Sequence, residues 1–135
     1  MIDEDKDYQM RETDSLHRRI LAVDDEEMNN KRIAFIMKEE PRYEIVSATS
    51  GMEALELLKE QRFDLILLDV MMPEMDGLET LRRIRENFST PVVLMTGDKT
   101  LNISEELGCD DYITKPVLPL LIKEIIHNMT ERTSL

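Results

Sequence analysis

The sequence contains little cysteine and no long apolar run, and each absence excludes a class of protein. Cys109 is the single cysteine among 135 residues, which excludes an internal disulfide framework and a zinc site built from several cysteines. No apolar run approaches the roughly 20 residues that a membrane-spanning helix needs. Residues 1–7 read MIDEDKD, which is too acidic for a signal peptide. We therefore expect a cytoplasmic protein without membrane association.

Basic residues are also scarce. The chain has 17 Lys and Arg against 29 Asp and Glu, a formal net charge of −12. A surface this acidic opposes direct binding to nucleic acid, because a phosphate backbone needs cations to neutralise it. It remains compatible with a divalent metal ion or a basic partner. The apolar fraction of 41% and the charged fraction of 34% indicate a soluble globular protein, and the length predicts one domain.

The chain divides into three parts. Residues 1–18 hold six acidic and three basic residues with no apolar period, which predicts an N-terminal acidic extension. Residues 19–131 carry the folded domain, and residues 132–135 form a short polar tail. No repeat or low-complexity tract is present.

Short apolar runs alternate with segments of helical spacing from Arg19 onward. We expect strands over Ile20–Val23, Tyr43–Ala48, Leu65–Leu68, Val92–Met95 and Tyr112–Thr114. Between and after them we expect helices carrying Ile33–Met37, Ala54–Leu58, Leu78–Ile84, Leu101–Leu107 and Leu121–Met129. This alternation predicts an α/β fold, a doubly wound parallel sheet with helices on both faces. Central strands without polar alternation fit a sheet that is covered on both sides.

Two of the helices have further signals. Gly108 suits the left-handed backbone that ends the helix over Leu101–Leu107. Pro119 can open the last helix, which we expect to carry Leu121, Ile122, Ile125 and Met129 on one face.

Reactive or ligating side chains follow four of the predicted strands. Asp24 and Asp25 come after the first, Asp69 after the third, Thr96 after the fourth and Lys115 after the fifth. The carboxyl ends of parallel strands lie at one edge of a sheet, where ligands bind. A polar residue that starts a loop would be unremarkable alone, but four at corresponding places predict a site.

The chemistry of that site follows from its charges. Asp24, Asp25 and Asp69 repel one another when ionised, and Mg²⁺ is a natural counter-ion because it prefers carboxylates, carbonyl oxygens and water. The ammonium of Lys115 and the hydroxyl of Thr96 complete a site for an incoming phosphoryl group. Asp69 ends the most apolar strand and is the expected nucleophile, which would form an acyl phosphate.

The chain resembles the receiver domain of two-component response regulators, the CheY-like family, over about residues 19–131. The resemblance rests on four motifs in order: VDDE at 23–26, DVMMPEMDG at 69–77, MTG at 95–97 and DYITKP at 111–116. The stretch from Asp69 to Gly77 is the most specific of them. The resemblance implies a five-stranded sheet in the order 2-1-3-4-5.

The resemblance also implies a role for each matched residue. Asp69 would accept a phosphoryl group from a phosphohistidine on a sensor histidine kinase or a histidine phosphotransfer protein. Mg²⁺ would be held by Asp24 or Asp25, by Asp69 and by the backbone carbonyl of Met71. Thr96 and Lys115 would be catalytic, binding the phosphoryl oxygens.

The remaining implications concern signalling. Thr96 and Tyr112 would be switch residues that carry the change to a downstream effector. The protein would be a monomer or a phosphorylation-dependent dimer, and it would catalyse only its own phosphorylation and dephosphorylation. A cis bond between Lys115 and Pro116 is also implied.

One departure from the family pattern bears on output. Only 18 residues separate Thr96 from Lys115, a few fewer than usual, which predicts a shortened fourth helix over Leu101–Leu107. That helix belongs to the usual output face of the family. A docking receiver that acts without phosphorylation is therefore an alternative.

Two enzyme or cofactor classes compete with this interpretation. A Mg²⁺-dependent phosphatase with an aspartate nucleophile usually carries a second aspartate two residues later, where this chain has Met71. A flavin-binding module of similar topology needs an anion-binding loop after the first strand, where residues 24–27 are all acidic.

For Tyr112, packing between helices is the alternative to the switch role.

Overall fold

A five-stranded parallel sheet forms the centre of the molecule. The computed structural model describes residues 17–97 and 108–133. The strands are β1 Arg18–Val23, β2 Tyr43–Ala48, β3 Leu65–Asp69, β4 Val92–Thr96 and β5 Asp111–Thr114. The described helices are α2 Glu27–Ile36, α3 Gly51–Glu60, α4 Gly77–Asn87 and α5 Pro119–Thr133. The strands are hydrogen-bonded in the order β2-β1-β3-β4-β5, which confirms the predicted fold class and strand order.

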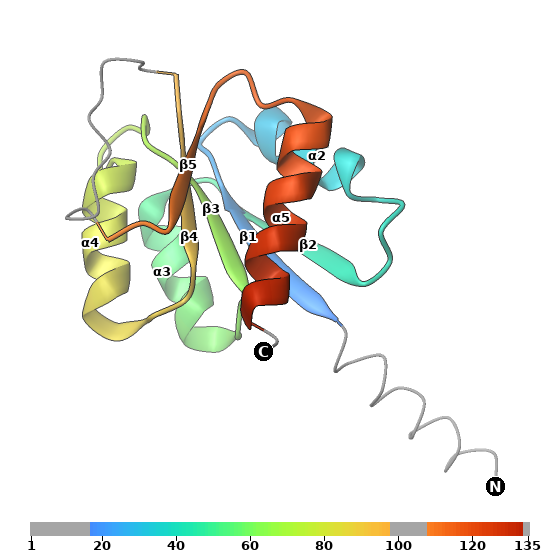
Figure 1. The fold of residues 1–135 in the computed structure, drawn as a ribbon. Helices are drawn as coiled ribbons and strands as arrows, with labels where there is room; N and C mark the ends of the chain where they lie inside the picture. Colours follow the sequence, from blue (N-terminus) through green and yellow to red (C-terminus); the bar gives the residue numbers. More distant parts are fainter. Residues whose placement is uncertain (1–16, 98–107, 134–135) are drawn as a thin grey trace, which may run out of the picture.

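Helices cover both faces of the sheet. Figure 1 shows α2 and α5 against one face and α3 and α4 against the other. Every residue of β3 and β4 is buried, as are the last four of β1. Side chains of these strands alternate between two apolar clusters, one under each helical layer. The apolar composition of the central strands therefore follows from burial on both sides.

The helices α3 and α4 begin with side-chain caps. Ser50 accepts a hydrogen bond from the backbone N–H of Glu53 at 3.1 Å, and Asp76 accepts one from the N–H of Glu79 at 2.9 Å. Such caps satisfy N–H groups of the first turn that have no partner inside the helix. They start both helices directly after loops that leave the carboxyl edge of the sheet.

The buried face of α5 differs from the prediction at two positions, Leu121 and Ile126. Ile122, Ile126 and Met129 are buried, and Ile125 is partly buried against the same cluster. Leu121, predicted to share that face, is 39% exposed. The spacing of four and then three residues selects a stripe that excludes Leu121 and includes Ile126, which the sequence analysis missed.

Some predictions fall outside the described residues. The shortened fourth helix over Leu101–Leu107 does, and so does most of the extension at residues 1–18. Gly108, at the start of the second described range, has the predicted left-handed backbone with φ of 84°. Among the described residues, no helix combines the length and the apolar character needed to cross a bilayer.

A close backbone approach after β3 depends on glycine. The backbone N–H of Gly77 donates to the carbonyl oxygen of Val70 at 2.8 Å. A Cβ atom at position 77 would lie 2.7 Å from Cα of Val70 and would overlap the carbonyl group of Asp69. The first residue of α4 thus packs directly on the backbone that follows the end of β3.

We predict that Gly77→Ala destabilises the fold by about 1–3 kcal/mol, because backbone atoms cannot move away as a flexible side chain can. Urea unfolding measures the loss. Gly97→Ala is the matched control, since nothing lies within 4 Å of a Cβ atom there. Equal stabilities of the two variants would contradict the close approach.

Candidate functional site

The predicted site residues lie at the carboxyl edge of the sheet. Asp24 and Asp25 follow β1, Asp69 ends β3, Thr96 ends β4 and Lys115 follows β5. Asp24, Asp69 and Thr96 are 1%, 2% and 1% exposed, whereas Asp25 is exposed. One carboxylate oxygen from each aspartate lies within 4.8 Å of those of the other two. Residues 45 positions apart in sequence therefore form one acidic cluster.

The ammonium of Lys115 joins two of these carboxylates. Its Nζ lies 3.0 Å from Oδ1 of Asp69 and 3.2 Å from Oδ2 of Asp24. The backbone N–H of Lys115 donates to the carbonyl oxygen of Thr96 at 2.7 Å, which fixes the lysine beside the end of β4. The bond from Lys115 to Pro116 is cis, as expected.

Burial and charge act in opposite directions on the two partners of the central ion pair. Burial raises the pKa of Asp69; the ammonium of Lys115 and the backbone N–H of Met71 lower it in part, and the nearby charge of Asp24 raises it. Burial disfavours the ammonium of Lys115, but Asp69 and Asp24 outweigh burial and raise its pKa. The site therefore holds more negative charge than one ammonium can balance.

The donor set of the cluster suits a small divalent cation. Oδ1 of Asp69 is buried, and although it lies within ion-pair distance of Lys115 it accepts no hydrogen bond among the described residues. Because this buried oxygen accepts no hydrogen bond, its lone pairs are available to coordinate a cation. Three carboxylates that converge from two strand ends provide the oxygen ligands that Mg²⁺ prefers.

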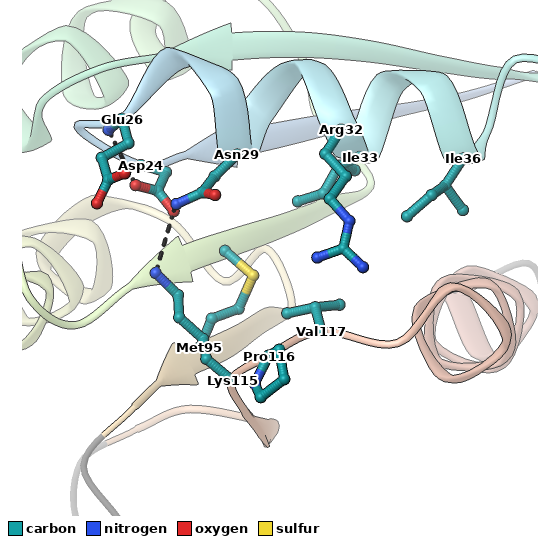
Figure 2. Close-up of a pocket in the computed structure, with 10 residues that line it drawn as sticks. All are labelled: Asp24, Glu26, Asn29, Arg32, Ile33, Ile36, Met95, Lys115, Pro116 and Val117. Atoms are coloured by element: carbon teal, nitrogen blue, oxygen red, sulfur yellow. Dashed lines mark hydrogen bonds and ion pairs between the residues drawn. The ribbon is translucent and has the colours of Figure 1, made fainter.

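Sequence reasoning missed two residues that hold Asp24. Nδ2 of Asn29 donates to Oδ2 of Asp24 at 3.1 Å, and Nδ2 of Asn30 donates to the carbonyl oxygens of Asp24 at 3.1 Å and Ala48 at 3.0 Å. Figure 2 shows Asn29 reaching Asp24 from α2 while Lys115 reaches it from the other side of the cavity. The available signal was a pair of amides within the first turn or so of the helix that follows the acidic pair.

The side chain of Tyr112 on β5 is 49% exposed. About half of its surface is therefore covered, as the packing alternative requires, and about half is accessible. The side chain of Met71 is 67% exposed, and its backbone N–H lies near the carboxylate of Asp69.

A cavity of about 460 Å³ opens beside the acidic cluster, between α2 and the connection from β5 to α5 (Figure 2). Its lining includes apolar side chains, and Asp24 and Lys115 belong both to this lining and to the charged groups of the cluster. The lining side chains are those of Asp24, Glu26, Asn29, Arg32, Ile33, Ile36, Met95, Lys115, Pro116 and Val117.

Comparisons with known proteins identify the family of the chain. The family model described as the response regulator receiver domain matches residues 20–127. The chain belongs to the response regulator receiver family. Its place in the CheY-like family, inferred above from four motifs, is thereby confirmed.

A curated relative covers most of the chain. The chain is similar to the transcriptional regulatory protein SrrA of Staphylococcus aureus, at 36% identity over 121 residues that make up 87% of this chain and 50% of that protein. It thus spans about half the length of this curated relative.

Two solved structures share the fold. A CheY-like response regulator receiver domain protein from Methanospirillum hungatei JF-1 is 29% identical with a TM-score of 0.75, covering 87% of this chain and 97% of that one. A response regulator receiver domain protein from Clostridium thermocellum is 26% identical with a TM-score of 0.77, covering 86% and 96%.

We predict that Asp69→Asn stabilises the metal-free protein at neutral pH. A carboxyl whose pKa is raised by folding destabilises the folded state above that pKa, and the penalty disappears as pH falls through it. The variant should therefore have a higher melting temperature than the wild type at pH 7, and the gap should narrow as the pH is lowered.

Asp25→Asn is the control for this prediction, because it removes the same charge from an exposed position in the same cluster. Its melting temperature should change less. A lower melting temperature for Asp69→Asn at pH 7 would show that the ion pair with Lys115 outweighs burial.

Proposed function

We propose that this receiver domain accepts a phosphoryl group on Asp69 from a phosphohistidine of a sensor histidine kinase or a histidine phosphotransfer protein. As a response regulator receiver domain, the chain belongs to two-component signalling. The observation that carries the finer proposal is the convergence of three carboxylates and one ammonium at the ends of β1, β3 and β5. A cytoplasmic location is part of the same proposal.

In the proposed reaction an oxygen of the Asp69 carboxylate attacks phosphorus in line with the donor nitrogen. The bond from phosphorus to nitrogen breaks, its electron pair stays on the imidazole, and the imidazole takes up a proton from solvent. The product is an acyl phosphate on Asp69. The ammonium of Lys115, 3.0 Å from Oδ1 of Asp69, is placed to bind a phosphoryl oxygen.

Mg²⁺ fits the acidic cluster on the donor set described above. Asp24, Asp25 and Asp69 would hold it with their carboxylates, and the backbone carbonyl of Met71 would add a ligand. When bound, the ion withdraws charge from the phosphoryl oxygens and offsets the repulsion among the carboxylates. The carboxylates of the cluster would bind the ion, and Lys115 and Thr96 would bind and orient the phosphoryl oxygens.

The signalling step is a population shift between two conformations. Phosphorylation favours the active one only through interactions that it makes better there, which we assign to Thr96 and Lys115. A shift from 1:99 to 99:1 needs roughly 5.5 kcal/mol. A few charge-assisted hydrogen bonds of about 1.5–3 kcal/mol each can supply it. Tyr112, half-exposed on β5, would carry the change to a downstream effector.

We predict a single Mg²⁺-dependent phosphoryl adduct after incubation with acetyl phosphate, because a small donor needs the site but no docking surface. Intact-mass spectrometry measures it. Asp69→Asn should lose the adduct completely, and Asp25→Asn should keep part of it because Asp24 and Asp69 remain.

A folded, Mg²⁺-binding protein that gains no adduct from acetyl phosphate or from a panel of phosphorylated histidine phosphotransfer domains would contradict the proposal. The docking receiver that acts without phosphorylation would then be the better account.

We predict that Lys115→Met tightens Mg²⁺ binding and abolishes phosphorylation. Removing a cation that touches two of the ligand carboxylates relieves repulsion of at least about 1 kcal/mol, roughly a five-fold gain in affinity. The same change removes the group placed to bind the phosphoryl oxygen. Calorimetric titration with Mg²⁺ gives the first effect and intact mass the second.

Lys59→Met is the control, since it removes an exposed ammonium from the last turn of α3. It should change neither quantity. Weaker Mg²⁺ binding by Lys115→Met would mean that the lysine organises the carboxylates rather than competing with the ion.

A further inference from the structure

Asp24 is the most firmly held carboxylate of the acidic cluster. Its Oδ1 accepts a hydrogen bond from the backbone N–H of Glu26 at 3.0 Å. Its Oδ2 accepts from Nδ2 of Asn29 at 3.1 Å and from Nζ of Lys115 at 3.2 Å. The carboxylate of Asp25, in contrast, is exposed and has no hydrogen bond or ion pair within the described residues.

The backbone at Asp24 is fixed independently. Its N–H donates to the carbonyl oxygen of Ala48 at 3.1 Å, and Nδ2 of Asn30 bridges the carbonyl oxygens of both residues. Asn30 is 1% exposed, and because both neighbours of its nitrogen are acceptors, the orientation of its amide is determined. With the backbone held, the remaining freedom of Asp24 lies in its side-chain torsions.

The three donors to the Asp24 carboxylate differ in charge and in the part of the structure that they come from. The N–H of Glu26 belongs to the local turn, and Lys115 divides its charge between Asp24 and Asp69. Among the described residues, Asn29 offers the one neutral side-chain donor to the carboxylate of Asp24, since Asn30 binds the backbone carbonyl oxygen of that residue. It can orient Asp24 without adding a positive charge that would repel a metal ion.

We infer that Asn29 is a positioning residue, which holds Asp24 in the orientation that binds a divalent cation. This inference rests on the proposed function, since it concerns the same acidic cluster. Hydrogen-bond partners of metal-ligating side chains typically contribute about 10–100-fold to metal affinity because they fix the ligand before the ion arrives. Asn29 and Lys115 share Oδ2 of Asp24, yet their removal should change Mg²⁺ affinity in opposite directions.

The test is a Mg²⁺ titration of the full chain followed by amide NMR spectra, with melting temperatures measured alongside. Asn29→Ala should weaken Mg²⁺ binding by at least about 10-fold. Asn29→Gln keeps an amide donor on a longer arm and should restore part of the affinity. Met28→Ala is the matched control, because Met28 is the preceding residue of α2 and is 73% exposed; its affinity should equal that of the wild type.

A double-mutant cycle with Asp24→Asn separates positioning from a general effect on α2. If Asn29 acts through Asp24, the loss caused by Asn29→Ala should largely vanish when position 24 carries no carboxylate. An equal loss in both backgrounds would overturn the inference, because it would assign the effect to the helix. A lower melting temperature with unchanged Mg²⁺ affinity would overturn it as well.

The same set of variants also distinguishes failure of this inference from failure of the proposed function. Wild-type affinity in Asn29→Ala, combined with weak binding in Asp24→Asn, would overturn the role of Asn29 and leave the metal site standing. Wild-type affinity in Asp24→Asn would remove Asp24 from the ligand set and overturn the role of Asn29, while the proposed reaction at Asp69 would be judged by the phosphorylation measurement alone. Phosphorylation of Asp69, measured by intact mass, reports on the proposed reaction in every variant.

Discussion

The rest of the structure depends on the burial of two carboxylates, Asp24 and Asp69, against a single ammonium. A buried carboxylate without a partner is costly, and one lysine between two carboxylates leaves negative charge uncompensated. Burial, together with the nearby charge of Asp24, raises the pKa of Asp69. The uncompensated negative charge suits a divalent cation, which would supply the missing positive charge. The site is thus set up by folding, at a cost in stability, before any ligand arrives.

The parallel sheet makes this arrangement possible with few residues. Strands β1, β3 and β4 are buried throughout their last four positions, so their ends are rigid. Asp69 and Thr96 are the last residues of β3 and β4, and Asp24 and Lys115 directly follow β1 and β5, so the sheet itself brings the candidate site residues together. Local devices complete the placement: Gly77 packs on the backbone after β3, Asn30 bridges the ends of β1 and β2, and the N–H of Lys115 bonds to Thr96.

Much of this was predictable because burial on both faces produces unbroken apolar strands. The runs at residues 65–68 and 92–95 located β3 and β4, and the polar residues that end or follow the strands located the candidate site. The pattern failed where one face is only partly covered: Leu121 looks as apolar as Ile122 yet is 39% exposed. It also gave no weight to Asn29 and Asn30, because a hydrogen bond across the first turn of a helix leaves no periodic signal.

The most direct test of the account is to locate the phosphoryl group chemically. An acyl phosphate on aspartate is reduced by borohydride to homoserine, so phosphorylated protein can be reduced, digested and sequenced by mass spectrometry. The account predicts homoserine at position 69 alone, formed only when Mg²⁺ was present during phosphorylation. Homoserine at position 24 or 25, or a stable phosphate on a serine or threonine, would contradict it.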